Sequence, residues 1–197
     1  IFSKKNQYPK VICGQGVAPE KATITHYKNL GLNVVPGSGL LSAVVPGAFD
    51  AWMLLLLNYG SMKLSDVLRP AISISEKGYP LVPNIINTIK SVKDLFLEDW
   101  KSSAKVYLPN GKLPNIGDFF SNKKMSETYK KIVDEASSFS SNREKQIEKA
   151  REIWKSGFIA ENIHNFCKNN YFIDTSDRKH NGLLDGNDLA SWQAHEE

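Results

Sequence analysis

Apolar residues in this sequence recur mainly at the three- and four-residue intervals that are typical of α-helices. The longest pattern of this kind covers residues 143–167, where Ile147, Ala150 and Trp154 fall on one side of the predicted helix. Gly157 lies inside the same stretch and is a candidate break, because glycine weakens a helix interior. The pattern predicts a long helical region in the last third of the chain.

The densest apolar segment lies between Pro46 and Gly60. Pro46 is expected in the first turn of a helix, where its missing N–H costs nothing, and Asp50 suits the positive end of the helix dipole. Residues 51–57 are apolar on every side, which predicts a buried helix, and Gly60 is expected to end it in the left-handed conformation. A buried strand is the alternative for so short a run, but four leucines and both end signals favour a helix.

A second helix is predicted to begin at Leu64 and to end at Gly78. Pro70 lies inside it, and a proline clashes with the preceding turn, so we expect a kink or a break there. Further helices are expected over residues 22–30, 84–97, 125–136 and 189–194. Residues 105–120 contain several turn-forming pairs and are predicted to form a short hairpin or loop.

Strand signals are few. The short apolar run at residues 11–13 ends at Gly14-Gln15-Gly16, which predicts a strand followed by a tight turn. The expected fold class is therefore α+β, mostly helical with a few short strands. The 197 residues are enough for one domain with a core. Because the sequence starts at Ile1 and ends on acidic residues without a closing element, we interpret it as a piece of a longer or processed polypeptide.

Composition excludes some classes of function. The chain has 25 Lys and Arg against 21 Asp and Glu, and its basic residues form scattered pairs without interleaved aromatics, which argues against nucleic-acid binding. No apolar run approaches the roughly 20 residues that a membrane-spanning helix needs. No secretory signal peptide is visible.

Reactive side chains do not assemble into a recognisable site in the sequence. Cys13 and Cys167 are too few and too far apart for a disulfide framework or a zinc motif, so we expect buried free thiols. His164 stands three residues before Cys167, but two ligands do not make a metal site. Thr25 and His26 are expected on a helix surface, because an N-terminal nucleophile needs its own free amine. We therefore predict no catalytic residue, metal ligand or cofactor from the residues themselves.

Several ordered motifs resemble the large subunit of the gamma-glutamyltransferase (gamma-glutamyltranspeptidase) family. The first group is Ala18-Pro19 with Ala22-Thr23, Val45-Pro46-Gly47, Tyr59-Gly60, Pro70-Ala71 and Gly78-Tyr79. The second group is Trp154-Lys155-Ser156-Gly157 with Ile159-Ala160, and Gly182-Leu183-Leu184 with Asp188-Leu189-Ala190. These motifs extend over most of the chain, and the sequence is identified on them as a segment that looks like a gamma-glutamyltransferase-related paralogue.

The resemblance implies an N-terminal nucleophile hydrolase with a four-layer αββα sandwich. Residues 1–197 would be part of the large subunit of one such domain, with a strand and turn over 9–19 and a helical region over 20–197. The resemblance further implies a precursor that cleaves itself, and a small subunit whose N-terminal Thr, outside this chain, attacks a gamma-glutamyl or related amide of a small molecule. That subunit would be the partner, and no cofactor is implied.

Gln15 departs from the resemblance. It falls where the glutathione-cleaving members of the family place an Arg that holds the substrate α-carboxylate, which makes it a candidate substrate-binding residue. Arg offers a charged fork for two hydrogen bonds, whereas Gln offers a neutral amide. One interpretation is a paralogue that acts on a different amide; the other is that Gln15 is a turn residue and another cation replaces the Arg. The alternative to an enzyme is a catalytically silent helical scaffold or binding protein.

Overall fold

A computed structural model describes residues 1–2 and 8–197 of the chain, which divides into two compact units. The first unit combines residues 1–62 with residues 135–197, and the second consists of residues 63–134. No helix among the described residues is long and apolar enough to cross a membrane.

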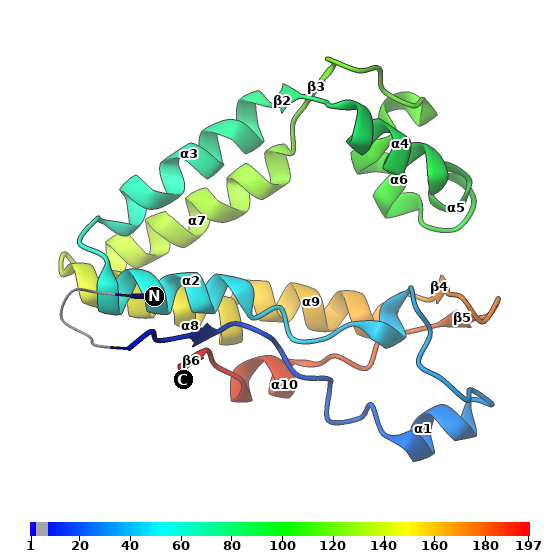
Figure 1. The fold of residues 1–197 in the computed structure, drawn as a ribbon, viewed down its shortest axis with the longest axis horizontal. Helices are drawn as coiled ribbons and strands as arrows, with labels where there is room; N and C mark the ends of the chain where they lie inside the picture. The colour runs from blue at the N-terminus through cyan, green and yellow to red at the C-terminus, as the bar shows by residue number, and fades with distance from the viewer. Residues whose placement is uncertain (3–7) are drawn as a thin grey trace. The chain divides into compact units, whose positions relative to one another are not determined.

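The first unit is mainly helical, with two short antiparallel pairs of strands. Its helices are α1 (Ile24–Asn29), α2 (Ala48–Tyr59), the end of α7 (Lys123–Phe139), α8 (Arg143–Ser156), α9 (Phe158–Asn169) and α10 (Gly186–Ser191), with a 3-10 turn at Leu40–Ser42. Its strands are β1 (Ile12–Cys13) with β6 (His195–Glu196), and β4 (Phe172–Ile173) with β5 (Lys179–His180). α2 packs along α8, and α9 continues from α8 (Figure 1).

The long helical region predicted over residues 143–167 is confirmed, including its break. Gly157 is extended, at φ −97° and ψ −154°, and separates α8 from α9. Local sequence explains the ends as well: the Asn142 side chain accepts a hydrogen bond from the Lys145 N–H and caps α8. The predicted strand at β1 and the helix that begins after Thr23 are also present.

The predictions for α2 need three corrections. Pro46 lies before the N-cap, Gly47, and not in the first turn. Gly60 ends the helix in an extended conformation, at φ −95°, instead of the left-handed one. The helix is not buried on all sides, since Trp52 is 65% exposed. An apolar run predicts a helix with hydrophobic side chains all round it. Which of these side chains are buried depends on where neighbouring helices pack against it.

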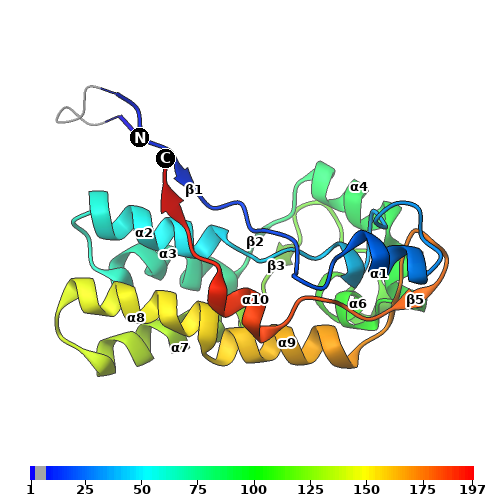
Figure 2. The same ribbon diagram turned by 90° about the horizontal axis from the view of Figure 1, so that it is seen from below.

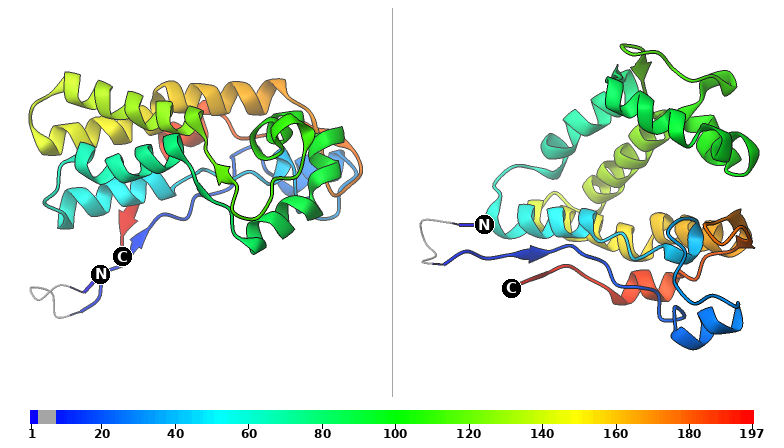
Figure 3. Two further views of the ribbon diagram at one scale, coloured as in Figure 1. Left: turned by 90° about the horizontal axis from the view of Figure 1, so that it is seen from above. Right: turned by 45° about the vertical axis from the view of Figure 1, so that its right-hand side comes forward.

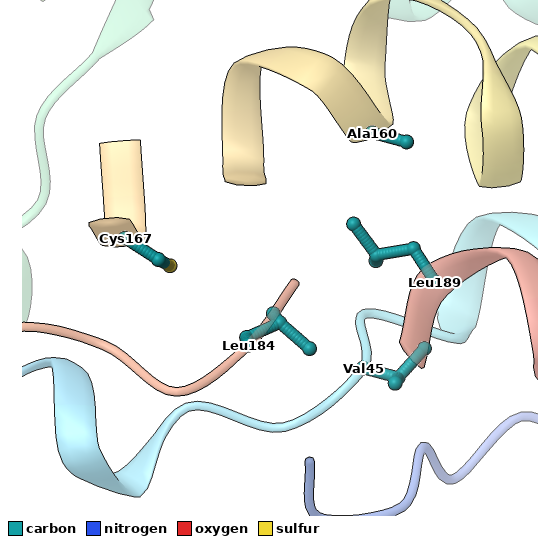
Figure 4. Close-up of a cluster of buried hydrophobic side chains, with 5 residues drawn as sticks. All are labelled: Val45, Ala160, Cys167, Leu184 and Leu189. Carbon is teal, nitrogen blue, oxygen red and sulfur yellow. The ribbon is translucent and has the colours of Figure 1, made fainter. Parts of the chain in front are cut away.

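Two clusters of buried side chains contribute to the core of the described part of the first unit. The first joins the segment before α2, α9 and the region of α10, through Val45, Ala160, Cys167, Leu184 and Leu189 (Figure 4). The second consists of Tyr27, Leu32, Leu41 and Leu183. Cys167 is therefore a buried free thiol, as predicted, and burial raises its pKa. Cys13 is also free but only half-buried.

The second unit is a set of short helices that follows one longer helix. Its elements are α3 (Leu64–Lys77), β2 (Tyr79–Pro80), α4 (Pro83–Ser91), α5 (Lys93–Glu98), α6 (Lys101–Tyr107), a 3-10 turn (Pro109–Gly111), β3 (Phe119–Phe120) and the start of α7. β2 pairs with β3. A 2.7 Å ion pair between Lys130 and Glu76 links α7 to α3.

The predictions for the second unit are corrected in part. α3 is one helix through Pro70, so the break is wrong, because a proline removes one hydrogen bond and the rest of the helix keeps its own; the kink stays a prediction. The single helix predicted over residues 84–97 is two helices, separated at Val92 (φ −112°, ψ 8°). The loop predicted over 105–120 is confirmed between the end of α6 and β3, whereas its alternative, a hairpin, is wrong, because β3 pairs with β2.

Asp174 fixes the turn between β4 and β5. Its carboxylate is buried and accepts hydrogen bonds from the Ser176 hydroxyl (2.6 Å) and the Ser176 N–H (2.8 Å), and it contacts His180 Nδ1 at 2.7 Å. Burial by itself raises the pKa of Asp174, but the contacts to Ser176 and His180 together hold it below its ordinary value of 3.8.

We expect the turn to lose stability in acid. A lowered pKa means that the contribution of Asp174 is complete above the ordinary carboxyl range and is lost as the pH falls through the lowered folded-state pKa. Asp174→Asn should lower the free energy of unfolding by roughly 1–3 kcal/mol at neutral pH. Thermal unfolding of the full-length protein across the acid range checks this. An acid-induced loss that is as large in Asp174→Asn as in the natural sequence would contradict it.

Candidate functional site

The candidate residue Gln15 lies in the loop that follows β1. Its side chain is exposed, while the glycines on both sides are pressed against other parts of the first unit. A Cβ atom on Gly14 would lie 2.7 Å from the Ala51 Cβ in α2, and one on Gly16 would lie 1.7 Å from the Val45 carbonyl oxygen. Only residues without a side chain fit at these two positions, so the backbone that carries Gln15 is closely packed.

The chain that follows Gln15 is fixed by hydrogen bonds. The Val45 N–H donates to the Val17 carbonyl at 3.0 Å. The Glu20 N–H donates to Asp188 Oδ1 at 2.8 Å, and the Lys21 ammonium donates to Asp185 at 2.7 Å. The loop is thus held against the segment before α2 and against the start of α10.

The start of α10 is itself fixed by its local sequence. Asp185 is the N-cap, and its carboxylate and that of Asp188 accept hydrogen bonds from each other's backbone N–H, which forms a capping box. Hydrogen bonding to Lys21 lowers the pKa of Asp185, and the backbone donors of the cap act in the same direction. The last helix therefore begins directly after its cap and spans residues 186–191, instead of the predicted 189–194.

A buried ion pair anchors the first turn of α2. The Arg151 guanidinium in α8 donates to both oxygens of Asp50, at 2.6 and 3.2 Å, and the Ala194 N–H donates to Asp50 Oδ2 at 2.7 Å. Asp50 is only 3% exposed. Its hydrogen bond raises the pKa of Arg151, against the opposing effect of burial. Asp50 therefore ties α2, α8 and the segment after α10 to one point.

Aromatic side chains complete this support. The Trp154 ring stacks on Phe49 with 4.4 Å between ring centroids, and its Nε1–H donates to the Pro46 carbonyl at 2.9 Å. A Cβ on Gly47 would lie 2.2 Å from the Trp192 ring and 2.5 Å from the Gly14 carbonyl oxygen. The loop after β1 and the segment before α2, which meet beside Gln15, are therefore packed against the tryptophan rings.

The Gln15 carboxamide makes no hydrogen bond to any residue within 1–2 and 8–197. A side chain that is exposed, lacks such a partner and stands on a fixed backbone can contact a ligand without first breaking an internal bond. This arrangement is compatible with a substrate contact and also with a plain turn residue.

Other residues that the sequence brought into question lie outside this arrangement. Thr25 is exposed on α1, next to His26, and neither side chain is hydrogen-bonded to an acidic or basic group among the described residues. His164 Nδ1 accepts a hydrogen bond from the Gly186 N–H at 3.4 Å, and Cys167 is buried in the core. These positions agree with the structural roles expected for them.

Comparison with known proteins identifies the family. The model of the family described as gamma-glutamyltranspeptidase matches residues 1–197. The chain belongs to the gamma-glutamyltranspeptidase family. The resemblance drawn from the sequence motifs is thereby confirmed.

Individual proteins resemble the chain along most of its length. The chain is 28% identical to the glutathione hydrolase-like YwrD proenzyme of Bacillus subtilis, over 86% of this chain and 29% of that protein. It is 47% identical to the solved structure of LmbA2991HD, with a TM-score of 0.92, over 95% of this chain and 32% of that one. The gamma-glutamyltranspeptidase of Helicobacter pylori shares its fold, with 23% identity and a TM-score of 0.71 over 95% of this chain and 51% of that one.

The chain shares its mostly helical α+β fold with the solved gamma-glutamyltranspeptidase of Helicobacter pylori. It spans about a third of the length of the YwrD proenzyme and of LmbA2991HD, at 29% and 32%.

One group of reactive side chains is not visible in the sequence pattern. The Cys13 thiol, the His195 imidazole and the Glu197 carboxylate have ligand atoms within 4.8 Å of one another. The sequence analysis assigned no metal ligand, because these residues come from opposite ends of the chain. Only the pairing of β1 with β6 brings them together.

Proposed function

We propose that residues 1–197 are part of the large subunit of one N-terminal nucleophile hydrolase domain, with a strand and turn over 9–19 and a helical region over 20–197. The whole protein would be a hydrolase or acyltransferase that cleaves a gamma-glutamyl or related amide of a small molecule. The observation that carries this proposal is the family match along all 197 residues. That one relative is named a proenzyme supports a precursor that is processed.

In the proposed mechanism the nucleophile is a Thr outside this chain, at the N-terminus of the small subunit of the same precursor. Its own α-amine takes the hydroxyl proton as the oxygen attacks the amide carbonyl, and hydrogen-bond donors stabilise the oxyanion. The amine leaves with a proton, and an acyl-enzyme forms. Water or an acceptor amine then releases the acyl group. This chemistry needs no cofactor, and the segment described here contributes to the walls of the site.

Intact mass and N-terminal sequencing of the purified full-length protein test this proposal. We expect two polypeptides, one of which contains residues 1–197 and the other of which begins with Thr. A single uncut polypeptide, with no second chain that begins with Thr, would contradict the proposed enzyme activity. It would favour the catalytically silent scaffold.

We further propose that Gln15 contacts the substrate at the position where glutathione-cleaving members place an Arg. Support comes from its exposed carboxamide on a tightly packed glycine loop. A hydrogen bond to a charged group contributes about 1.5–3 kcal/mol, against about 1 kcal/mol for a neutral pair. A neutral amide therefore suits an amide substrate that lacks the α-carboxylate better than it suits glutathione.

Gln15→Arg in the full-length enzyme should increase cleavage of a gamma-glutamyl anilide. The difference between charged and neutral hydrogen bonds corresponds to roughly a tenfold gain in kcat/KM. Steady-state kinetics of both enzymes measure it. Gln193→Arg, the same change at another exposed glutamine, is the matched control and should leave kcat/KM unchanged. No gain in Gln15→Arg, or an equal gain in both variants, would favour the interpretation of Gln15 as a turn residue.

A further inference from the structure

Cys13, His195 and Glu197 form a cluster on the two-stranded ribbon of β1 and β6, which lie side by side in Figures 2 and 3. Cys13 is directly opposite His195 in the register. The pairing continues to Val11, whose N–H and carbonyl bond to the carbonyl and N–H of Glu197 at 3.0 and 2.9 Å. The cluster is thus set by ladder hydrogen bonds and not by a flexible loop.

The alternation of side chains along the ribbon separates this cluster from its neighbours. Glu196 faces α2, where its carboxylate accepts hydrogen bonds from Asn58 (2.7 Å) and Tyr59 (3.0 Å) and from Lys10 (2.9 Å). Successive strand residues point to opposite faces, so His195 and Glu197 both lie on the face turned away from α2. Cys13, opposite His195, lies on that same face.

The spacing of the three ligand atoms suits one metal ion. All lie within 4.8 Å of one another, and His195 Nε2 is 3.1 Å from Glu197 Oε1. Zinc bonds of about 2.3 Å to sulfur and 2.0–2.2 Å to nitrogen and oxygen place tetrahedral ligands about 3.4–3.6 Å apart. His195 and Glu197 are exposed and Cys13 is half-buried, so small side-chain rotations bring the three atoms to that separation.

We propose that Cys13, His195 and Glu197 bind a zinc ion, with the fourth position left to water. This set of a thiolate, an imidazole and a carboxylate selects zinc over magnesium or calcium, which prefer oxygen ligands alone. The proposal does not rest on the proposed amidase or acyltransferase activity. Its consequence is structural: the ion connects β1 to β6, which come from opposite ends of the segment, and stabilises their pairing.

Without a metal, the same residues offer little stabilisation. The His195 and Glu197 side chains are 57% and 60% exposed, and exposed ion pairs contribute about 0–1 kcal/mol. If the residues form a zinc site, added zinc binds and stabilises the protein; if they form only the His195–Glu197 contact, added zinc does neither.

The test uses the full-length protein, freed of metal with a chelator, and Zn²⁺ alone as the probe. Calorimetric titration should show one zinc equivalent that Cys13→Ser, His195→Gln and Glu197→Gln each weaken at least about tenfold. Replacing Zn²⁺ by Co²⁺ should give a thiolate charge-transfer absorption that Cys13→Ser abolishes. At the same Zn²⁺ concentration the melting temperature of the natural sequence should also rise by more than that of Cys13→Ser.

Cys167→Ala and His26→Ala are the matched controls, because they remove a thiol and an imidazole that lie outside the cluster. Both should bind Zn²⁺ as the natural sequence does. Three variants of the cluster are tested so that a failure of one to fold leaves two measurements. The proposal is overturned if the full-length protein binds no zinc, or if all three cluster variants bind it as tightly as the controls do.

Discussion

Arg151→Ala is expected to lower the free energy of unfolding of the full-length protein by about 3–5 kcal/mol. The change leaves Asp50, whose side chain is 4% exposed, without its guanidinium partner. A buried carboxylate without a counter-charge keeps its desolvation penalty and loses the attraction that offset it. The Ala194 N–H remains as one donor, which is too little to replace two charged hydrogen bonds. Urea unfolding, followed by intrinsic tryptophan fluorescence, measures the change.

Arg69→Ala is the matched control for this prediction. Arg69 pairs with Asp66 at 3.7 Å, and their side chains are 77% and 40% exposed. The same substitution there should cost less than about 1 kcal/mol, because solvent screens the pair. Similar losses of unfolding free energy at both positions would contradict the argument that burial makes the Asp50–Arg151 pair more important for stability.

Gly16→Ala should destabilise the first unit by about 3 kcal/mol or more, at the upper end of the cost of overpacking. The new Cβ would lie 1.7 Å from the Val45 carbonyl oxygen and 2.6 Å from its carbon. These are backbone atoms, and the Val45 N–H is bonded to the Val17 carbonyl, so they cannot rotate away as a side chain does. The loop must move instead, and Gln15 moves with it. Thermal unfolding measures the loss of stability, and kcat/KM for the gamma-glutamyl anilide measures the effect of moving Gln15.

Gly186→Ala is the control for this glycine. Within the described part of the chain, no heavy atom beyond the adjacent residues and the helix's own backbone lies within 4 Å of the position of an alanine Cβ there, and Gly186 is the first residue of α10. Alanine favours helix, so this change should be neutral or slightly stabilising. If Gly16→Ala were as harmless as Gly186→Ala, the close approach of the two loops would be wrong, and with it the fixed backbone beneath Gln15.

Much of the helical structure was predictable because its signals are local. The stripe that contains Ile147 and Ala150 and the break at Gly157 depend on residues three or four positions apart. The Asp185 cap is equally local. The failures arose where a helix depends on its surroundings: Val92 divides a region of continuous helical pattern, and α3 continues as one helix through Pro70.

The candidate site likewise has features that were predictable from consecutive residues and features that were not. The family was readable from ordered motifs, because a motif is a property of consecutive residues, whereas the role of Gln15 stays a prediction. The close packing of Gly16 on Val45 was not readable, since no sequence pattern tells which carbonyl a glycine will meet. The buried pair of Asp50 and Arg151 was missed for the same reason.

The sequence alone therefore determined the family, the helical class and most helix positions, all of which follow from short-range periodicity and consecutive motifs. Tertiary structure decided which side of α2 is covered, how the loop around Gln15 is held, and that Cys13 meets His195 and Glu197. Each of these depends on residues far apart in the chain. Their meeting is set by the register and packing of whole elements, and short-range patterns carry no record of either.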